Sequence, residues 1–319
     1  DRLFPNSPKM CMECWNGWFD VWGGDMHHTT SAEDYAKVVD DMLLRGSINM
    51  YMFIGGTNFG FTNGANHDDK YSADVTSYDY DALLTECGDI TPKYLAVRNA
   101  IKKHLSGELP QVPPNRKKVA YGKVKLSESA ELFENLENLS TPQYSDVPKC
   151  MEDYGGGYGY ILYTTRLNRD YIVSELSFEN IGDRAHIYIN EKYVGTVYVN
   201  DDELKVKFDA RAGDMLYIFC ENMGRTNFGS KMMYKKGITG RCLIDGKVHF
   251  GWSVYLLPMD YLDKVRYDKK VVAMPTFYRG EFEIDETADT FLRTENFTKG
   301  FVCINNFNLG RYWKAGPQK

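Results

Sequence analysis

Residues 48–54 read Ile-Asn-Met-Tyr-Met-Phe-Ile, an almost continuously apolar run that is typical of a parallel strand covered on both faces. A shorter apolar run, Met-Cys-Met-Glu-Cys-Trp, occupies residues 10–15. Between the runs, Ser31 and Asp34 have capping-box spacing. One helical face then carries Tyr35, Val38, Val39, Met42 and Leu43, with Gly46 as a stop. This order predicts strand, helix, strand.

A second helix is predicted to follow, with Thr91 as N-cap and Pro92 in the first turn. Its predicted buried face comprises Tyr94, Val97, Ile101 and Leu105, and Gly107 is its predicted end. Residues 1–107 therefore predict a β-α-β-α segment. The Gly-, Asn- and Asp-rich loop at residues 55–89 is long for a compact domain, which indicates a functional loop.

Length and composition limit the class of protein. At about 150 residues per domain, 319 residues predict two domains or three small ones. The net charge of -6 gives no reason to expect a nucleic-acid partner. No apolar run approaches the ~18 residues of a membrane-spanning helix, so we expect no membrane partner. Seven cysteines in a long chain argue against a disulfide scaffold and favour a reducing compartment, so we expect a cytoplasmic protein.

The proline-rich residues 108–118 predict a linker, after which hydrophobic residues alternate with a period of two. We predict strands at 160–167, 171–178, 185–190, 193–199, 204–208, 215–221, 241–250, 252–257, 276–284 and 300–305. Asp245-Gly246 predicts a tight hairpin turn. Many short strands with regular turn signals indicate β-sandwich or jelly-roll modules.

Glu13 is the most informative polar residue, because it stands among Met12, Cys14 and Trp15 at the end of a predicted parallel strand. A carboxylate in an apolar setting needs a reason, which is either a structural salt bridge or catalysis. The strand's C-terminal end favours catalysis if the segment belongs to an α/β barrel. The aromatic residues Trp15, Trp18, Phe19 and Trp22 predict either a stacking wall for a sugar ring or ordinary core packing.

Other motifs are interpreted as structural. Cys11 and Cys14 form a CxxC pair, but their odd separation on a strand should point the thiols to opposite faces. We therefore expect neither a metal nor a redox site there, and we interpret Cys14 as a core residue. His27-His28 is interpreted as a loop pair. The glycine patch at 155–159 lacks the Lys-Ser/Thr of a phosphate-binding loop.

Residues 13–23, Glu-Cys-Trp-Asn-Gly-Trp-Phe-Asp-Val-Trp-Gly, resemble the nucleophile motif of the family 35 glycoside hydrolases, the β-galactosidases. Similar blocks follow in family order at residues 49–60, 76–82, 86–89, 222–229 and 306–313. The resemblance implies the C-terminal portion of such an enzyme. Residues 1–107 would supply the last two β/α units of a TIM (β/α)8 barrel, without its first part. β-Sandwich (jelly-roll) domains would follow at 119–262 and 263–319, the second truncated.

The resemblance also implies a retaining β-galactosidase acting on terminal, non-reducing β-D-galactosyl residues. Its substrate would be a β-galactoside oligosaccharide or glycan. Glu13 would be the nucleophile, Tyr51 would border the sugar, and Trp18 and Trp15 would line its subsite. Three further residues would contribute to the substrate site. Asn58 and Phe59 would shape the loop around it, and Phe228 would reach its rim from the β-domain.

The family's acid/base is a Glu in an Asn-Glu-Tyr-Gly-type motif after an earlier barrel strand, and this sequence lacks that motif. Asn190-Glu191-Lys192-Tyr193 is similar but lies in a predicted β-hairpin. We therefore expect the chain by itself to be inactive or nearly so. Two alternatives stay open: a non-catalytic galactoside-binding or architectural module, and a related exo-glycosidase such as a β-glucosaminidase. None of these functions requires a metal or an organic cofactor.

Overall fold

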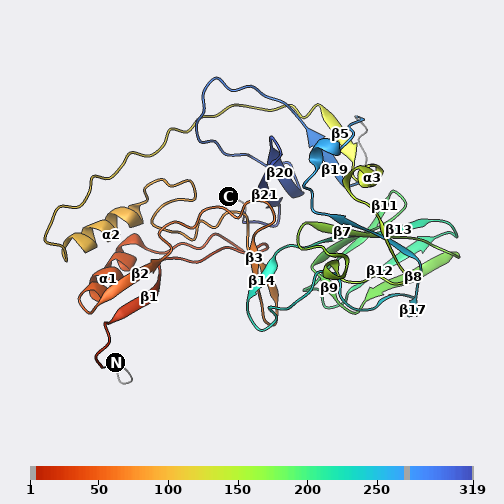
Figure 1. The fold of residues 1–319 in the computed structure, drawn as a ribbon, viewed down its shortest axis with the longest axis horizontal. Helices are drawn as coiled ribbons and strands as arrows, with labels where there is room; N and C mark the ends of the chain where they lie inside the picture. The colour runs from red at the N-terminus through yellow and green to blue at the C-terminus, as the bar shows by residue number, and fades with distance from the viewer. Residues whose placement is uncertain (1–4, 269–273, 318–319) are drawn as a thin grey trace.

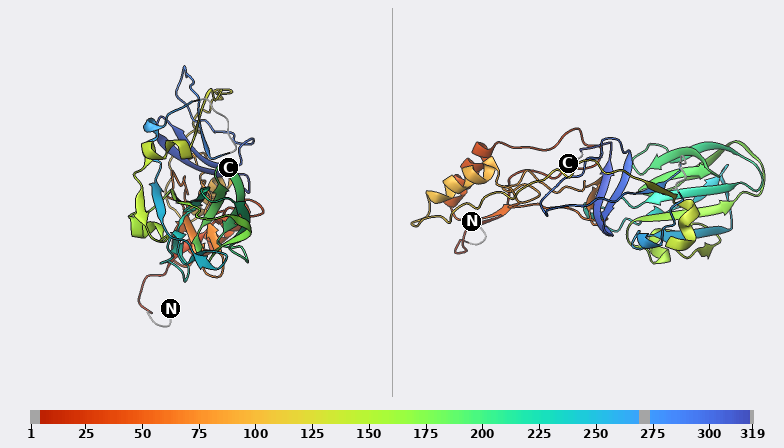
Figure 2. Two further views of the ribbon diagram at one scale, coloured as in Figure 1. Left: turned by 90° about the vertical axis from the view of Figure 1, so that its right-hand side faces the viewer. Right: turned by 90° about the horizontal axis from the view of Figure 1, so that it is seen from above.

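The computed structural model describes residues 5–268 and 274–317. The molecule is elongated, with two helices at one end and a β-sandwich at the other (Figures 1 and 2). No helix in the described part of the chain is long and apolar enough to cross a membrane.

The first segment has the predicted order, β1 (Met10–Trp15), α1 (Ala32–Leu43), β2 (Ser47–Tyr51) and α2 (Pro92–Lys102). Both predicted caps are present, since the Ser31 side chain accepts from Asp34 N and Thr91 accepts from Tyr94 N. Two boundaries differ from the prediction. Strand β2 stops at Tyr51 rather than at Ile54, and α2 stops at Lys102, five residues before Gly107.

Strands β1 and β2 pair in parallel, but β1 contains a bulge. Cys11 lies opposite Ile48 and Cys14 opposite Met50, so three steps on β1 match two on β2. The prediction that the two thiols face opposite sides is therefore wrong, because the extra residue restores the same face. Both cysteines pack in the core cluster beneath α1, and Cys14 is buried as predicted.

This small sheet is covered by helices on one face only in the described structure. Met10, Met12, Trp15, Phe53 and Ile54 are all exposed. Within residues 5–268 and 274–317, the strand predicted at 48–54 is therefore not covered on both faces. The helix faces also differ slightly from the pattern, since Val38 and Leu105 are exposed.

The long loop after β2 contains two strands that the pattern missed, β3 (Gly64–His67) and β4 (Tyr71–Ala73). They form a three-stranded sheet with β14 (Arg225–Phe228), which runs parallel to β3 from 160 residues further along the chain. Residues of the helical segment and of the later β-rich region therefore share one sheet (Figure 1).

Most of the remaining strands form the β-sandwich. One antiparallel sheet has six strands in the order β11-β10-β13-β7-β18-β6, and the other has four in the order β12-β8-β16-β17. The strand bounds are β6 (Gln143–Ser145), β7 (Tyr160–Arg166), β8 (Tyr171–Phe178), β10 (Arg184–Ile189), β11 (Lys192–Tyr198), β12 (Lys205–Ala210), β13 (Met215–Glu221), β16 (Cys242–Ile244), β17 (Lys247–Val248) and β18 (Trp252–Leu257).

The sandwich core lies between these two sheets. Ile161, Ile187 and Ile218 of the larger sheet share one buried cluster with Leu176 and Phe208 of the smaller. The predicted strand at 241–250 is instead a hairpin of β16 and β17, with Asp245-Gly246 as its turn, as that dipeptide indicates. The short strands β9 (Ile181–Gly182) and β15 (Gly237–Ile238) pair with each other at the edge.

The last part of the chain returns to both earlier regions. Strand β19 (Thr276–Arg279), much shorter than the predicted 276–284, pairs with β5 (Glu128–Glu131), which precedes the short helix α3 (Leu136–Leu139). The hairpin of β20 (Lys299–Ile304) and β21 (Phe307–Trp313) then contacts the loop after β2, where Gly60 N donates to Asn308 O.

Candidate active site

Glu13 lies near the C-terminal end of β1, and its side chain is exposed rather than buried. Glu13 is therefore not the buried, compensated carboxylate that its apolar neighbours in the sequence indicate. The bulge in β1 spans this position, and Trp15, two residues on, donates its indole N–H to Glu13 Oε1 at 2.6 Å. This hydrogen bond orients one carboxylate oxygen and leaves the other accessible, as attack on a substrate requires.

An aromatic cluster stands beside this carboxylate. The Trp15 and Trp18 rings meet edge to face at 5.1 Å, and Trp18 stacks on Phe19 at 5.1 Å. Tyr51, at the end of β2, meets Tyr80 edge to face at 5.3 Å. The structure therefore gathers the predicted Trp15, Trp18 and Tyr51 in one aromatic cluster, to which Trp15 connects Glu13.

Two tyrosines complete this cluster, although the sequence reasoning assigned them no role. Tyr78 stacks on Phe19 and on Tyr80, and its hydroxyl lies 3.5 Å from that of Tyr51. Burial, with smaller effects of Tyr51 and Glu13, raises the pKa of Tyr80 to about 12. Tyr80 is therefore a neutral hydrogen-bond donor at neutral pH. Both tyrosines lie in the block at residues 76–82 that resembles the family.

Two glycines let these segments approach closely. A Cβ at Gly17 would lie 1.9 Å from Tyr80 O, and a Cβ at Gly55 would lie 1.6 Å from Tyr78 O. Any larger residue would push the tyrosine-bearing loop away from the ends of β1 and β2. The glycines of the two motifs thus determine how near Tyr78 and Tyr80 come to Glu13.

The other three predicted site residues lie elsewhere. Asn58 uses its side-chain amide to donate to Val75 O, and Phe59 packs edge to face on Phe307. Phe228 is exposed on β14, in the middle of the molecule and away from β1 (Figure 1). The side-chain contacts of Asn58 and Phe59 therefore tie these two residues to neighbouring loops and strands rather than to Glu13.

The histidine pair lies in a loop, as interpreted from the sequence. His27 Nδ1 and His28 Nδ1 lie 2.6 and 2.9 Å from the two carboxylate oxygens of buried Asp20. Burial by itself would raise the pKa of Asp20, but the hydrogen bonds from both histidines outweigh it and hold that pKa below its usual value. Within residues 5–268 and 274–317, no group of three or more His, Cys, Asp or Glu is arranged to hold a metal ion.

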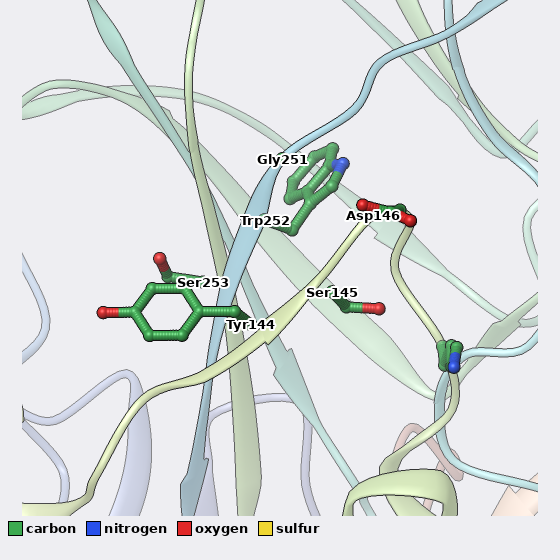
Figure 3. A pocket seen from close by; sticks show the side chains of 7 residues that line it. Tyr144, Ser145, Asp146, Gly251, Trp252 and Ser253 are labelled. Carbon is green, nitrogen blue, oxygen red and sulfur yellow. The ribbon is translucent and has the colours of Figure 1, made fainter.

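A cavity of about 620 Å³ lies on the sandwich, between β6 and β18 (Figure 3). Its lining residues are Tyr144, Ser145, Asp146, Lys149, Gly251, Trp252 and Ser253. Trp252 is buried and donates its indole N–H to His249 O, so Tyr144 supplies the open aromatic surface there. The cavity has far fewer aromatic rings than the surroundings of Glu13, which we therefore take as the candidate site.

Comparison with known proteins shows which family the chain resembles. Residues 1–104 match the family described as glycosyl hydrolases family 35. The chain belongs to this family. Two further domain families match later parts of the chain. Residues 148–258 match the first all-beta domain of beta-galactosidase, and residues 275–319 match its galactose-binding domain.

Curated relatives extend the match over nearly the whole family 35 chain. A beta-galactosidase of Xanthomonas manihotis is 38% identical over 99% of this chain and 54% of its own length. The human beta-galactosidase-1-like protein 2 is 37% identical over 98% of this chain and 51% of its own length. A Bos taurus beta-galactosidase is 37% identical over 99% of this chain and 52% of its own length. The chain therefore spans about half the length of these relatives.

One solved structure, a GH2 beta-galacturonidase from Eisenbergiella tayi, is 16% identical and covers 42% of this chain and 25% of its own, with a TM-score of 0.23. This likeness is too distant to inform the fold.

Proposed function

We propose that this family 35 chain is part of a retaining β-galactosidase that hydrolyses terminal, non-reducing β-D-galactosyl residues. The observation that carries the proposal is an exposed carboxylate, Glu13, oriented by Trp15 beside a cluster of five further aromatic rings. Galactose has an apolar C–H face that packs on such rings while its hydroxyls bind polar groups. Relatives named beta-galactosidase support the same substrate class.

In the proposed mechanism, Glu13 attacks the anomeric carbon and forms a covalent galactosyl-enzyme, which water then hydrolyses. Trp18 and Trp15 would line the sugar subsite. The hydroxyls of Tyr51 and Tyr80 would donate to the sugar or to Glu13. For Asn58, Phe59 and Phe228, roles in shaping the loop and the rim stay predictions, because the contacts of Asn58 and Phe59 lie elsewhere and Phe228 is exposed on β14.

A retaining enzyme also needs a second carboxyl about 5 Å from the nucleophile, first as acid and then as base. Three carboxylates of the surrounding loops already have other partners. Asp81 pairs with Lys93, Asp20 binds His27 and His28, and Glu86 accepts from Thr57. We propose that the acid/base lies outside residues 1–319, and that the chain by itself has little or no activity.

The test uses the full-length enzyme and a nitrophenyl β-galactoside. We expect Glu13→Gln to lower kcat/KM at least about 1,000-fold, because it removes the nucleophile but keeps the shape. A 2-deoxy-2-fluoro-β-galactoside with a dinitrophenolate leaving group should label the wild-type enzyme, and peptide mass mapping should find the label on Glu13. Retained activity in Glu13→Gln, or a label on another residue, would disprove the assignment.

Two further measurements on the full-length protein separate the alternatives. A galactoside-binding module would bind galactose in calorimetry without turnover by the full-length protein. A β-glucosaminidase of the family would cleave the corresponding glucosaminide faster than the galactoside in a panel of nitrophenyl sugars. The 319-residue chain is assayed beside the full-length enzyme. Activity in the full-length enzyme alone would support an acid/base outside residues 1–319.

A further inference from the structure

Beneath the aromatic cluster lies a buried lysine for which the proposed chemistry has no use. Lys93, in the first turn of α2, is only 3% exposed. Its ammonium donates to Asn16 O at 2.6 Å, Thr30 Oγ1 at 2.7 Å and Asp81 O at 2.7 Å, and it pairs with Asp81 Oδ2 at 2.5 Å. Three N–H donors thus face four acceptors from three separate segments, so the buried charge is fully compensated.

We propose that Lys93 is a positioning residue for the Glu13 site, fixing the end of β1 and the tyrosine-bearing loop relative to each other. The inference rests on the proposed function, because it assigns Lys93 to the same reaction. The Lys93 ammonium acts through the backbone that carries the aromatic rings, since Asn16 directly follows Trp15 and Asp81 directly follows Tyr80.

Asn16 extends the connection to β2. This residue is 1% exposed, and its backbone N–H donates to Tyr51 O at 3.2 Å. Its side-chain amide donates to Met52 O at 2.5 Å and accepts from Met52 N at 3.1 Å. The carbonyl that Lys93 binds therefore belongs to the residue that holds the end of β2 and, with it, Tyr51.

Thr30, which is exposed, also binds both Asn16 and Asp81. Its hydroxyl donates to Asn16 O at 2.6 Å, and its backbone N–H donates to Asp81 Oδ2 at 2.6 Å. Asn16 and Asp81 are thus bridged twice, by Lys93 from below and by Thr30 from the loop before α1. Five chain segments meet at these groups: the ends of β1 and β2, the loop before α1, the tyrosine-bearing loop and the first turn of α2. Three of them carry aromatic residues of the site.

The loop that Lys93 holds has an unusual backbone. Tyr80 and Asp81 have φ values of 62° and 53°, a left-handed conformation that non-glycine residues rarely adopt. Such a conformation persists when surrounding contacts hold it. Lys93 supplies two of these contacts to Asp81, one to the carbonyl and one to the carboxylate. Removing them frees Tyr80 to move with respect to Glu13.

The test compares Lys93→Met with wild type in the full-length enzyme. Methionine keeps most of the volume but removes the ammonium. The fluorosugar with a dinitrophenolate leaving group titrates the competent sites, and turnover is then expressed per titrated site. We expect kcat per titrated site to fall about 100-fold, the loss typical of a misplacement of about 1 Å. A purely structural lysine would lower the number of titrated sites and leave kcat per site unchanged, which would overturn the inference.

Lys103→Met is the matched control, because Lys103 caps the other end of α2 and forms an exposed ion pair with Asp40 at 2.6 Å. It should keep wild-type turnover per site. If Lys93→Met does not fold, Thr30→Val tests the positioning role instead. Thr30 is exposed, and the change removes only the hydroxyl that bridges Asn16 and Lys93. We expect a loss of about fivefold per titrated site, with the neighbouring Thr29→Val unchanged. Wild-type turnover in Thr30→Val would overturn the inference.

The Glu13→Gln variant keeps the two proposals apart. If it is active, the proposed function fails, whatever Lys93 does. If it is inactive while Lys93→Met and Thr30→Val match wild type per site, only the positioning role fails.

Discussion

At the scale of single residues, Asp74 makes the stability of the chain depend on pH. Asp74 is 7% exposed, and its Oδ1 has no hydrogen-bond partner among the described residues. Burial raises the pKa of Asp74 to about 7. Between about pH 4 and pH 7, the folded state therefore holds a proton that the unfolded state has lost, and the free energy of unfolding falls as the pH rises through this window.

We predict that Asp74→Asn removes this fall and raises the free energy of unfolding at pH 8 by about 2 kcal/mol, because a neutral amide needs no deprotonation in the core. Urea unfolding of the 319-residue chain at pH 5 and pH 8 measures both effects. Asp69→Asn is the control, since Asp69 is exposed. Equal pH dependence in wild type and Asp74→Asn would contradict the prediction.

At the scale of secondary structure elements, one glycine governs the parallel pairing of β14 with β3. Gly229, directly after β14, has a φ of 110°, and a Cβ there would lie 2.4 Å from His67 O. We predict that Gly229→Ala lowers the free energy of unfolding by about 3 kcal/mol, since it adds a backbone clash to an unfavourable φ. Urea unfolding at constant pH measures the change.

Gly213 offers the matched control, with a φ of 96° and open space where its Cβ would lie. Gly213→Ala should cost about 1 kcal/mol, the conformational part alone. If both variants lose the same amount, close approach to β3 is not what requires glycine at position 229.

At the scale of the whole molecule, a buried charged network joins three parts of the chain. Arg311 on β21 donates to Glu221 Oε1 at 3.2 Å, to Asn222 O at 2.5 Å and to Asn63 Oδ1. Lys299 on β20 also donates to Glu221, at 2.7 Å. Burial would raise the pKa of Glu221, but Lys299 and Arg311 outweigh it and hold that pKa below its usual value. The network therefore connects the last hairpin to the sandwich and to the loop after β2.

We predict that Arg311→Met lowers the free energy of unfolding by about 3 kcal/mol, because it removes one partner of a buried carboxylate. Limited proteolysis should then cut near the β20–β21 hairpin earlier than in wild type. Arg279→Met is the control, since Arg279 forms an exposed pair with Glu128 that should contribute no more than about 1 kcal/mol. Equal losses in the two variants would refute the role of burial.

Part of the candidate site was predictable because its signals are short-range. Glu13, Trp15 and Trp18 fall within six consecutive residues, and Tyr51 ends the strand that pairs with theirs. Lys93 was not predictable, because a lysine in the first turn of a helix ordinarily faces solvent. Only its distance to Asn16, Thr30 and Asp81 shows that it is buried.

The sequence by itself determined the local elements: the capped helices, the two parallel strands, most strands of the sandwich and the Asp245-Gly246 hairpin. These follow from side-chain periodicity and caps, which act over a few residues. Only the tertiary structure decided the bulge in β1, the pairing of β3 with β14, and the burial of Lys93 and Arg311. Each depends on segments 12 to 248 residues apart, and the free energy of such contacts comes from packing and charge compensation that no local pattern encodes.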